Sequence, residues 1–150
     1  MSRDLPGPVV AGVLFVWALA ADLVTKAYFV ANARRLGVYL LYNRHDVHLA
    51  RRLVMVAVAI AVVVGLARLA QWRGLGRLPG AWLGVGVLAG GIVGNGISPA
   101  LWVYGVPDFI SMPGGWVWNV ADFEIGLGLV GGLGSIALGA AITYLRERGL

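Results

Sequence analysis

Two aspartates near the C-terminal end of the chain, Asp108 and Asp122, have the residue type and spacing that acid–base chemistry needs. They lie fourteen positions apart, and the residues around them are almost all apolar. A carboxylate at the edge of such segments is costly near hydrocarbon unless it has a task. A turn-rich stretch, Pro113-Gly114-Gly115, lies between them and would allow them to meet. Two carboxyls that meet in space could form an acid–base pair that activates water.

Such a pair could hydrolyse a peptide without a metal or a nucleophilic side chain. One carboxyl, ionised, would remove a proton from water, while the other, protonated, would polarise the scissile carbonyl. The stretch Asn119-Val-Ala-Asp122 has the spacing of a helix start with Asn119 as N-cap. The helix dipole there favours an ionised Asp122, so the sequence favours Asp122 as base and Asp108 as acid. The same spacing also fits an Asp122 that only caps the helix.

The composition indicates a membrane protein. Of 150 residues, 59% are hydrophobic and only 13% are charged, with a mean hydropathy of +0.82, whereas a soluble domain carries roughly a quarter charged residues. The net charge of +5 comes from eleven Arg and one Lys. No basic residue falls inside the long uncharged runs, which favours loop charges at lipid headgroups over a nucleic-acid surface.

The sequence predicts no metal and no cofactor. The chain has no Cys, which excludes disulfides, thiolate nucleophiles and Cys-based metal sites. The stretch His45-Asp46-x-His48 is the alternative, but it lacks the ligand spacing of known zinc motifs.

Four uncharged segments predict four transmembrane helices in a single domain over residues 1–150. The first segment covers residues 5–21, and its helix is expected to continue to about residue 32. Pro99 is expected to end the third helix near residue 97. The remaining helices are expected within residues 53–67, 80–97 and 125–145.

An even number of spans places both termini on one side and two polar connections, residues 32–52 and 98–118, on the other. Six Arg on the terminal side against five on the other favour cytoplasmic termini. Residues 37–42 predict a short strand that could pair with the second connection. The predicted fold class is an all-α membrane protein, a four-helix transmembrane bundle with a small extracytoplasmic β-like subdomain.

Four other polar residues could support the aspartates. Asp22 and Lys26 share one face of the first helix at i, i+4, and either pair with each other or orient the site. Asn95 closes a stripe of glycines on the third span and could bond to a neighbouring helix. Asn43 could cap a turn in the first connection.

Four short motifs, in order along nearly the whole chain, resemble those of the lipoprotein signal peptidases (type II signal peptidases), small four-span aspartic peptidases of the bacterial inner membrane. The family boxes that they resemble are D-x-x-[ST]-K, G-x-x-G-N, V-x-D-F-[IL] and F-N-x-A-D. Here they read Asp22-Leu-Val-Thr-Lys26, Gly91-Ile-Val-Gly-Asn95, Val106-Pro-Asp-Phe-Ile110 and Trp118-Asn-Val-Ala-Asp122. The resemblance implies that Asp108 and Asp122 are catalytic. The residues expected to bind substrate or support the site are Asp22, Lys26, Asn43, Asn95 and Asn119.

The resemblance also implies the substrate and the location. Such enzymes cut prolipoproteins just before a diacylglyceryl-modified Cys, so the expected partners are these proteins and membrane lipid, with no nucleic acid. The expected protein is a monomer with cytoplasmic termini and an active site toward the outer face. Aromatic residues crowd the second connection, where they could anchor the protein or contact substrate: Trp102, Tyr104, Trp116 and Trp118.

Two departures from the family pattern leave alternatives open. Ser98-Pro99 stands where the G-x-x-G-N box normally runs on to Asp-Arg, and the stretch after Asn43 lacks the usual small and aromatic residues. A catalytically impaired paralogue that binds lipoproteins is therefore one alternative. A small proton-coupled transporter is another, but it needs a carboxylate in mid-membrane, and the sequence places each carboxylate at a span edge.

Overall fold

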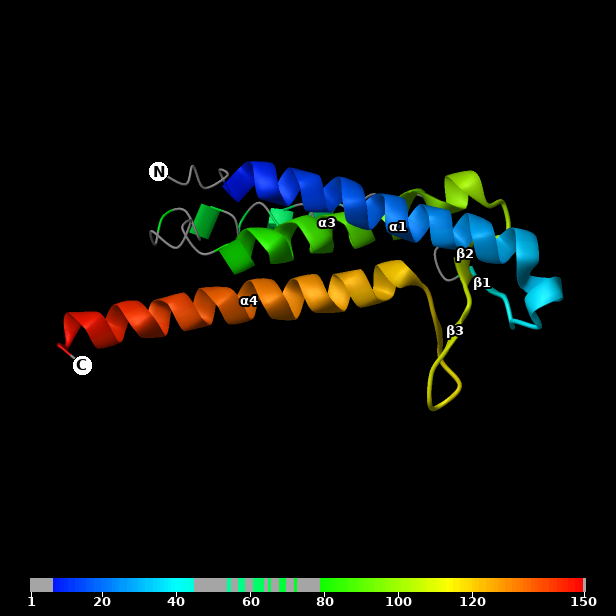
Figure 1. Cartoon of the computed structure of the whole chain (residues 1–150). Coiled ribbons are helices and arrows are strands. Elements are labelled where there is room, and N and C mark those ends of the chain that lie inside the picture. Colours follow the sequence, from blue (N-terminus) through cyan, green and yellow to red (C-terminus); the bar gives the residue numbers. More distant parts are fainter. Residues whose placement is uncertain are drawn as a thin grey trace.

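In the described part of the chain, three long helices run roughly along one another (Figure 1). The computed structural model describes residues 7–44 and 79–149, together with scattered positions between residues 54 and 72. The helices are α1 (Gly7–Leu36), α3 (Pro79–Leu101) and α4 (Val120–Glu147). Each is long and apolar enough to cross a bilayer, as predicted for three of the four spans. The predicted second span, residues 53–67, lies largely outside the described residues.

α1 and α3 run in the same direction, and α4 runs against both (Figure 1). Gly86 of α3 packs against Ala11, and Gly94 packs against Asp22, so the numbering rises together along α1 and α3. The chain therefore returns to the starting end of the bundle between these two helices. The beginning of α1 and the end of α4 lie at the same end (Figure 1).

α3 is the central helix. In its most apolar window 44% of the residues are buried inside the protein, against 17% for α1 and for α4. A Cβ at Gly90 would lie 2.5 Å from the Ala18 Cβ on α1, and a Cβ at Gly84 would lie 2.5 Å from the Gly132 backbone on α4. Glycine at these contacts lets the backbones of the described helices approach closely.

A two-stranded antiparallel sheet lies at the end of the bundle where α1 ends and α4 begins (Figure 1). It joins β1 (Leu41–Asn43) to β2 (Val106–Asp108), with Tyr42 opposite Pro107. The strand expected over residues 37–42 is therefore found later in the chain, at Leu41–Asn43, and it pairs with the second connection as expected.

A β-hairpin follows β2 and projects from the bundle (Figure 1). Its strands are β3 (Ile110–Ser111) and β4 (Val117–Trp118). The turn between them includes Gly114 and Gly115, whose φ angles of 88° and 82° favour glycine. The hairpin reverses the chain between Asp108 and the start of α4.

α3 continues past the point at which Pro99 was expected to end it, so that prediction is wrong. Pro99 lacks the N–H that would bond back to the previous turn. Trp102 N nevertheless donates to the Ser98 carbonyl at 2.8 Å and closes the last turn. The buried Ser98 hydroxyl also donates to the Gly94 carbonyl at 2.6 Å. A proline in the final turn of a packed membrane helix is tolerated when neighbouring bonds hold that turn.

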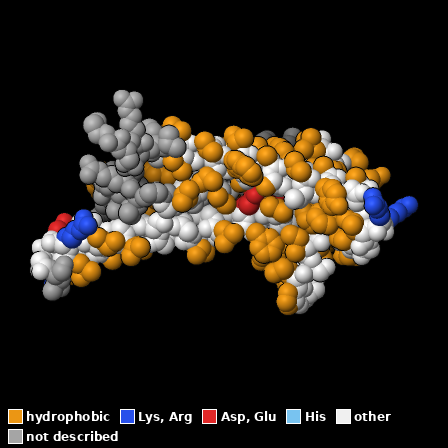
Figure 2. Space-filling view, viewed as in Figure 1, with side chains coloured by type: hydrophobic (Ala, Val, Ile, Leu, Met, Phe, Trp, Pro, Cys, Tyr) orange, Lys and Arg blue, Asp and Glu red, His pale blue; other side chains and the backbone are white. Residues whose placement is uncertain are grey.

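Hydrophobic side chains cover much of the visible surface, and basic side chains gather at its two ends (Figure 2). Arg34 and Arg35 lie in the last turn of α1, and Arg146 lies in the last turn of α4. This pattern of apolar flanks and basic ends is expected of helices that face lipid and end near headgroups. The exposed apolar residues of α1 and α4 include Val16, Trp17, Val24, Leu127 and Val130.

Candidate active site

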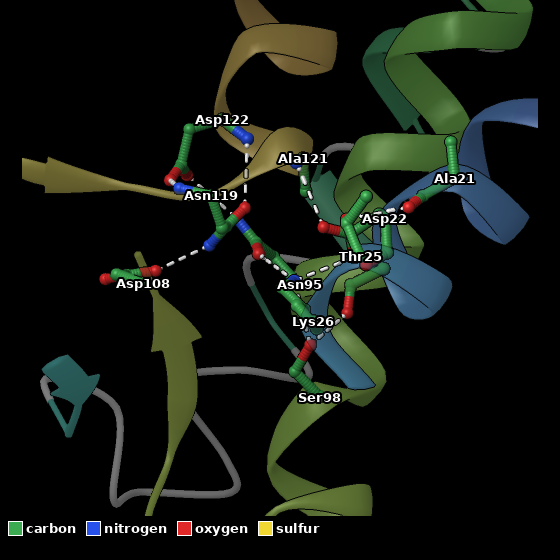
Figure 3. A network of polar contacts seen from close by, with 11 residues as sticks. Ala21, Asp22, Thr25, Lys26, Asn95, Ser98, Asp108, Asn119, Ala121 and Asp122 are labelled. Atoms are coloured by element: carbon green, nitrogen blue, oxygen red, sulfur yellow. Dashed lines mark hydrogen bonds and ion pairs between the residues drawn. The ribbon is translucent and has the colours of Figure 1, made fainter. Parts of the chain in front are cut away.

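A buried ion pair on α1 anchors the polar network at one end of the bundle (Figure 3). Lys26 Nζ lies 2.7 Å from Asp22 Oδ2, and both side chains are 0% exposed. Their i, i+4 spacing puts them on one face of the helix, so the interpretation in which they pair with each other is confirmed. A buried pair offsets its lost hydration only with good geometry and further hydrogen bonds.

α3 supplies those further bonds. Lys26 Nζ also donates to Asn95 Oδ1 at 2.8 Å and to Ser98 Oγ at 3.0 Å. With the bond to Asp22, all three ammonium hydrogens have an acceptor. The tertiary structure therefore joins α1 to the last turns of α3 through one cation.

Ser98 and Lys26 are residue types that act as nucleophile and base in some hydrolases. Here the hydrogen bonds run in the wrong direction for that role, because the ammonium donates to Ser98 and the hydroxyl donates to the Gly94 carbonyl. Ser98 is also 0% exposed. The arrangement leaves Ser98 without a base and makes it part of the packing around Lys26.

The start of α4 places Asp122 in the same network. Asn119 is the N-cap of a capping box, in which its side chain accepts from Asp122 N at 3.2 Å and its own N–H donates to Asp122 Oδ2 at 2.9 Å. Asn95 Nδ2 donates to Asp122 Oδ1 at 2.9 Å. One residue earlier, Ala121 N donates to Asp22 Oδ1 at 3.0 Å. Asp122 therefore caps α4, as one interpretation expected, and is also held by α3.

Asp108 reaches the network from the end of β2. Its side chain is nearly fully buried, and its Oδ1 accepts from Asn119 Nδ2 at 2.6 Å. Burial raises the pKa of Asp108 to about 6, and the charge of Asp122 acts in the same direction. Hydrogen bonds from Asn119 and Asn43 and the charge of Lys26 lower this pKa in part. Asp108 therefore keeps its proton to a higher pH than an ordinary aspartate does.

Aromatic contacts fix the strand that carries Asp108. The buried Phe109 ring stacks on Phe29 of α1, with 4.2 Å between ring centroids. Phe109 N donates to the Trp118 carbonyl at 2.9 Å, and the Trp118 ring packs edge-on against Phe123 of α4 at 5.1 Å. These contacts hold β2 against both α1 and the beginning of α4.

The predicted site residues come together in one hydrogen-bond network from α1 through α3 to α4 and β2 (Figure 3). Both catalytic candidates bond to Asn119, while Asn43 at the end of β1 joins the network at Asp108. That the two carboxyls face each other across a water stays a prediction. The residues of this hydrogen-bond network are Asp22, Lys26, Asn43, Asn95, Asp108, Asn119 and Asp122.

No group of three or more His, Asp or Glu that could hold a metal ion is found in the described part of the chain. His45, Asp46 and His48, the metal alternative in the sequence, lie outside the described residues.

The family of the chain is decided by comparison with known families. Residues 14–138 match the family described as signal peptidase (SPase) II. The chain belongs to the signal peptidase II family. A solved structure described as a bacterial membrane enzyme shares the fold, with a TM-score of 0.58 and 17% sequence identity over 92% of this chain and 90% of its own. Comparison with curated proteins finds no match.

The chain also contains a buried carboxyl that the motifs did not single out. Glu124 is 8% exposed, and its Oε2 has no hydrogen-bond partner among the described residues. It lies close enough to Asp22 and Lys26 to interact with their charges. A spacing signal was present, because Glu124 continues the buried stripe of α4 that includes Ala121 and Gly128.

That each carboxylate lies at a span edge stays a prediction, although two of the carboxyls lie within the helices. α1 runs to Leu36, so Asp22 lies in the middle of the helix, and α4 begins at Val120, so Glu124 lies inside it. The sequence placed Asp22 at an edge because the uncharged run stops there. Pairing with Lys26 allows the helix to continue past both charges.

Proposed function

We propose that this protein is an aspartic endopeptidase that removes the signal peptide from diacylglyceryl-modified prolipoproteins. The observation that carries the proposal is that one residue, Asn119, bonds to both Asp108 and Asp122. Membership of the signal peptidase II family supports the substrate class. The proposed location is a bacterial cytoplasmic membrane, with one four-span domain, cytoplasmic termini and the site toward the outer face.

The hydrogen bonds give the two aspartates different environments. Asp122 accepts from Asn119 N and Asn95 Nδ2 at the start of a helix, so both of its oxygens serve as hydrogen-bond acceptors. Asp108 is buried and its pKa is raised to about 6, so a larger fraction of it is protonated near neutral pH than of an ordinary aspartate. This asymmetry supports Asp122 as the base and Asp108 as the acid.

The proposed reaction is a water addition followed by bond cleavage. Asp122 takes a proton from water as the water oxygen bonds to the scissile carbonyl carbon, and Asp108 gives its proton to the carbonyl oxygen. The tetrahedral intermediate then collapses to a carboxylic acid as the C–N bond breaks. The amine leaving group takes the proton held by Asp122, and Asp108 recovers the proton from the hydroxyl oxygen.

The position of the site fits a substrate that is anchored in lipid. The hydrogen-bond network lies at the end of the bundle from which the hairpin projects. Hydrophobic side chains make up much of the visible surface at this end (Figure 2). Trp116 at the hairpin and Tyr104 before β2 are exposed. Such aromatic residues favour the headgroup region, where the bond next to a lipid-modified Cys would lie.

The direct test is cleavage of a diacylglyceryl-modified prolipoprotein by the purified protein in detergent. Asp108→Asn and Asp122→Asn should each lower kcat by about 10²–10⁴-fold. The matched control is Glu147→Gln, which removes an exposed carboxylate at the far end of α4 and should cleave like the parent. Equal cleavage by the parent and both aspartate variants would reject the mechanism.

A catalytically impaired paralogue is the second candidate, because Ser98-Pro99 stands at the Lys26 end of the network. Such a protein would bind the lipidated substrate without cutting it, so binding by a parent that does not cleave would favour it. The transporter alternative needs a carboxylate in mid-membrane that can carry a proton. Asp22, within α1, is salt-bridged to Lys26 with both side chains fully buried, which argues against that role.

A further inference from the structure

Two asparagine amides stand between a donor and an aspartate. An asparagine presents a carbonyl oxygen on one side and an NH₂ group on the other, so its orientation decides whether it accepts from or donates to a neighbour. Asn95 lies between Lys26 and Asp122, and Asn119 lies between the Asp122 backbone N–H and Asp108 (Figure 3). In each case the group on one side can only donate.

The donor on one side of each asparagine fixes the orientation of its side-chain amide. Lys26 Nζ lies 2.8 Å from Asn95 Oδ1, and an ammonium has no acceptor, so the Asn95 carbonyl must face it. The Asn95 NH₂ group is then directed at Asp122 Oδ1, 2.9 Å away. A reversed amide would set NH₂ against the ammonium and a carbonyl against a carboxylate.

We propose that Lys26 is a positioning residue for Asp122 that acts through the Asn95 amide. Lys26 holds the Asn95 carbonyl, and Asn95 therefore donates to the carboxylate that receives the proton from water. The consequence for activity rests on the proposed function of Asp122, whereas the orientation of the amide does not. Lys26 itself contacts no reacting atom in this arrangement.

The surroundings of Lys26 are built to keep its ammonium in place. Its three hydrogens bond to Asp22, Asn95 and Ser98, and the side chain is 0% exposed. The second oxygen of Asp22 accepts from Ala121 N, next to Asp122. The ion pair is therefore linked to the start of α4 in two ways, by Asp22 to the Ala121 backbone and by Lys26 through the Asn95 side chain to Asp122.

A purely structural role is the competing explanation, because breaking a buried ion pair destabilises a fold whatever the site does. The two explanations differ in what they predict for Asn95. A structural role leaves the Asn95 side-chain amide insensitive to the identity of residue 26 in folded protein. The positioning role requires that amide to lose its fixed orientation when Lys26 is removed.

The first test is NMR of protein labelled with ¹⁵N at asparagine in detergent micelles. The Asn95 NH₂ signals are identified by their loss in Asn95→Ala. Lys26→Met should shift these signals and speed their exchange with water, and Lys26→Arg, which also can only donate, should largely restore them. Unchanged Asn95 signals in folded Lys26→Met would overturn the proposal, and this readout does not require the protein to cleave anything.

The second test is kinetic and uses a variant that adds no charge beside Asp122. Asn95→Leu removes the donor to Asp122 Oδ1 and leaves Lys26 two of its three acceptors, Asp22 and Ser98. A purely structural role predicts lower stability but a parent-like kcat for the folded variant. Positioning predicts a kcat about 100-fold lower with KM little changed, because Asp122 then loses its donor. Parent-like kcat in folded Asn95→Leu would overturn the proposal while leaving the proposed function standing. A parent that does not cleave would instead count against the function, with the NMR test unaffected.

Discussion

Asn119, the N-cap of α4, donates its side-chain amide to Asp108, the last residue of β2, across 2.6 Å. This bond joins the connection between α3 and α4 to the beginning of α4. The same amide accepts from Asp122 N, so its orientation is set by a backbone donor. Helix capping and the placement of a candidate acid thus depend on one side chain.

The first prediction separates these two tasks of Asn119. Asp is as good an N-cap as Asn, so Asn119→Asp should keep α4 capped while removing the NH₂ donor to Asp108. We expect kcat/KM for prolipoprotein cleavage to fall by about 100-fold or more. Asn119→Ala, which loses both tasks, should also lower stability by about 0.5–2 kcal/mol. Parent-like cleavage by Asn119→Asp, measured beside thermal unfolding, would contradict this role.

The second prediction concerns pH. The pKa of Asp108 is raised by burial from 3.8 to about 6, so its protonated fraction falls as pH rises through about 6. Because the proposed acid must carry a proton, kcat/KM should decline on the alkaline side of that value. The measurement is a pH–rate profile with a substrate whose cleavage-site residues do not titrate. A profile that rises through pH 5–7 to a plateau would assign the ionised form of Asp108 to the reaction instead.

The free energy of unfolding should also fall as pH rises. The folded-state pKa of Asp108 lies above its ordinary value, so the folded protein binds more protons than the unfolded chain between these values. The contribution of Asp108 to stability is therefore fully present below about pH 4 and is lost as pH rises through about 6. Thermal unfolding of the parent and of Asp108→Asn across this range should show that the variant lacks this part of the dependence.

The third prediction concerns Glu124. Its Oε2 is buried without a partner among the described residues, and an unpaired buried polar group costs about 1–3 kcal/mol. Glu124→Met should therefore raise the free energy of unfolding by a similar amount, whereas Glu124→Gln keeps polar atoms in the same place and should not. A destabilised Glu124→Met would show that the carboxyl has a partner in the folded protein, such as a bound water.

The fourth prediction concerns the contact between α1 and α3. A methyl group at Gly90 would lie 2.5 Å from the Ala18 Cβ, so Gly90→Ala should push α1 away and destabilise the protein by about 1–3 kcal/mol. Gly126 is the matched control, because a Cβ there meets nothing within 4 Å. Gly126→Ala should be neutral or slightly stabilising through its higher helix propensity. Equal effects of the two substitutions on thermal unfolding would contradict the tight packing of α1 on α3.

Local signals in the sequence determined much of this protein. Three of the predicted spans are helices, because the hydropathy of a segment depends on its own residues. The pairing of Asp22 with Lys26 and the capping of α4 by Asn119 were also readable, because their partners lie three or four positions away. The family boxes named the remaining members of the network by resemblance.

The tertiary structure alone decided how these pieces meet. Lys26 reaches Asn95 across 69 positions, and Asn95 reaches Asp122 across 27, and a residue pattern in one segment cannot specify which side chain of another will face it. The buried surroundings of Ser98 beside Pro99 have the same origin, because the Lys26 ammonium that bonds to Ser98 comes from another helix. A residue pattern reports the local geometry of its segment and how readily that segment enters lipid. The orientation of a buried amide depends instead on donors that folding brings from elsewhere in the chain.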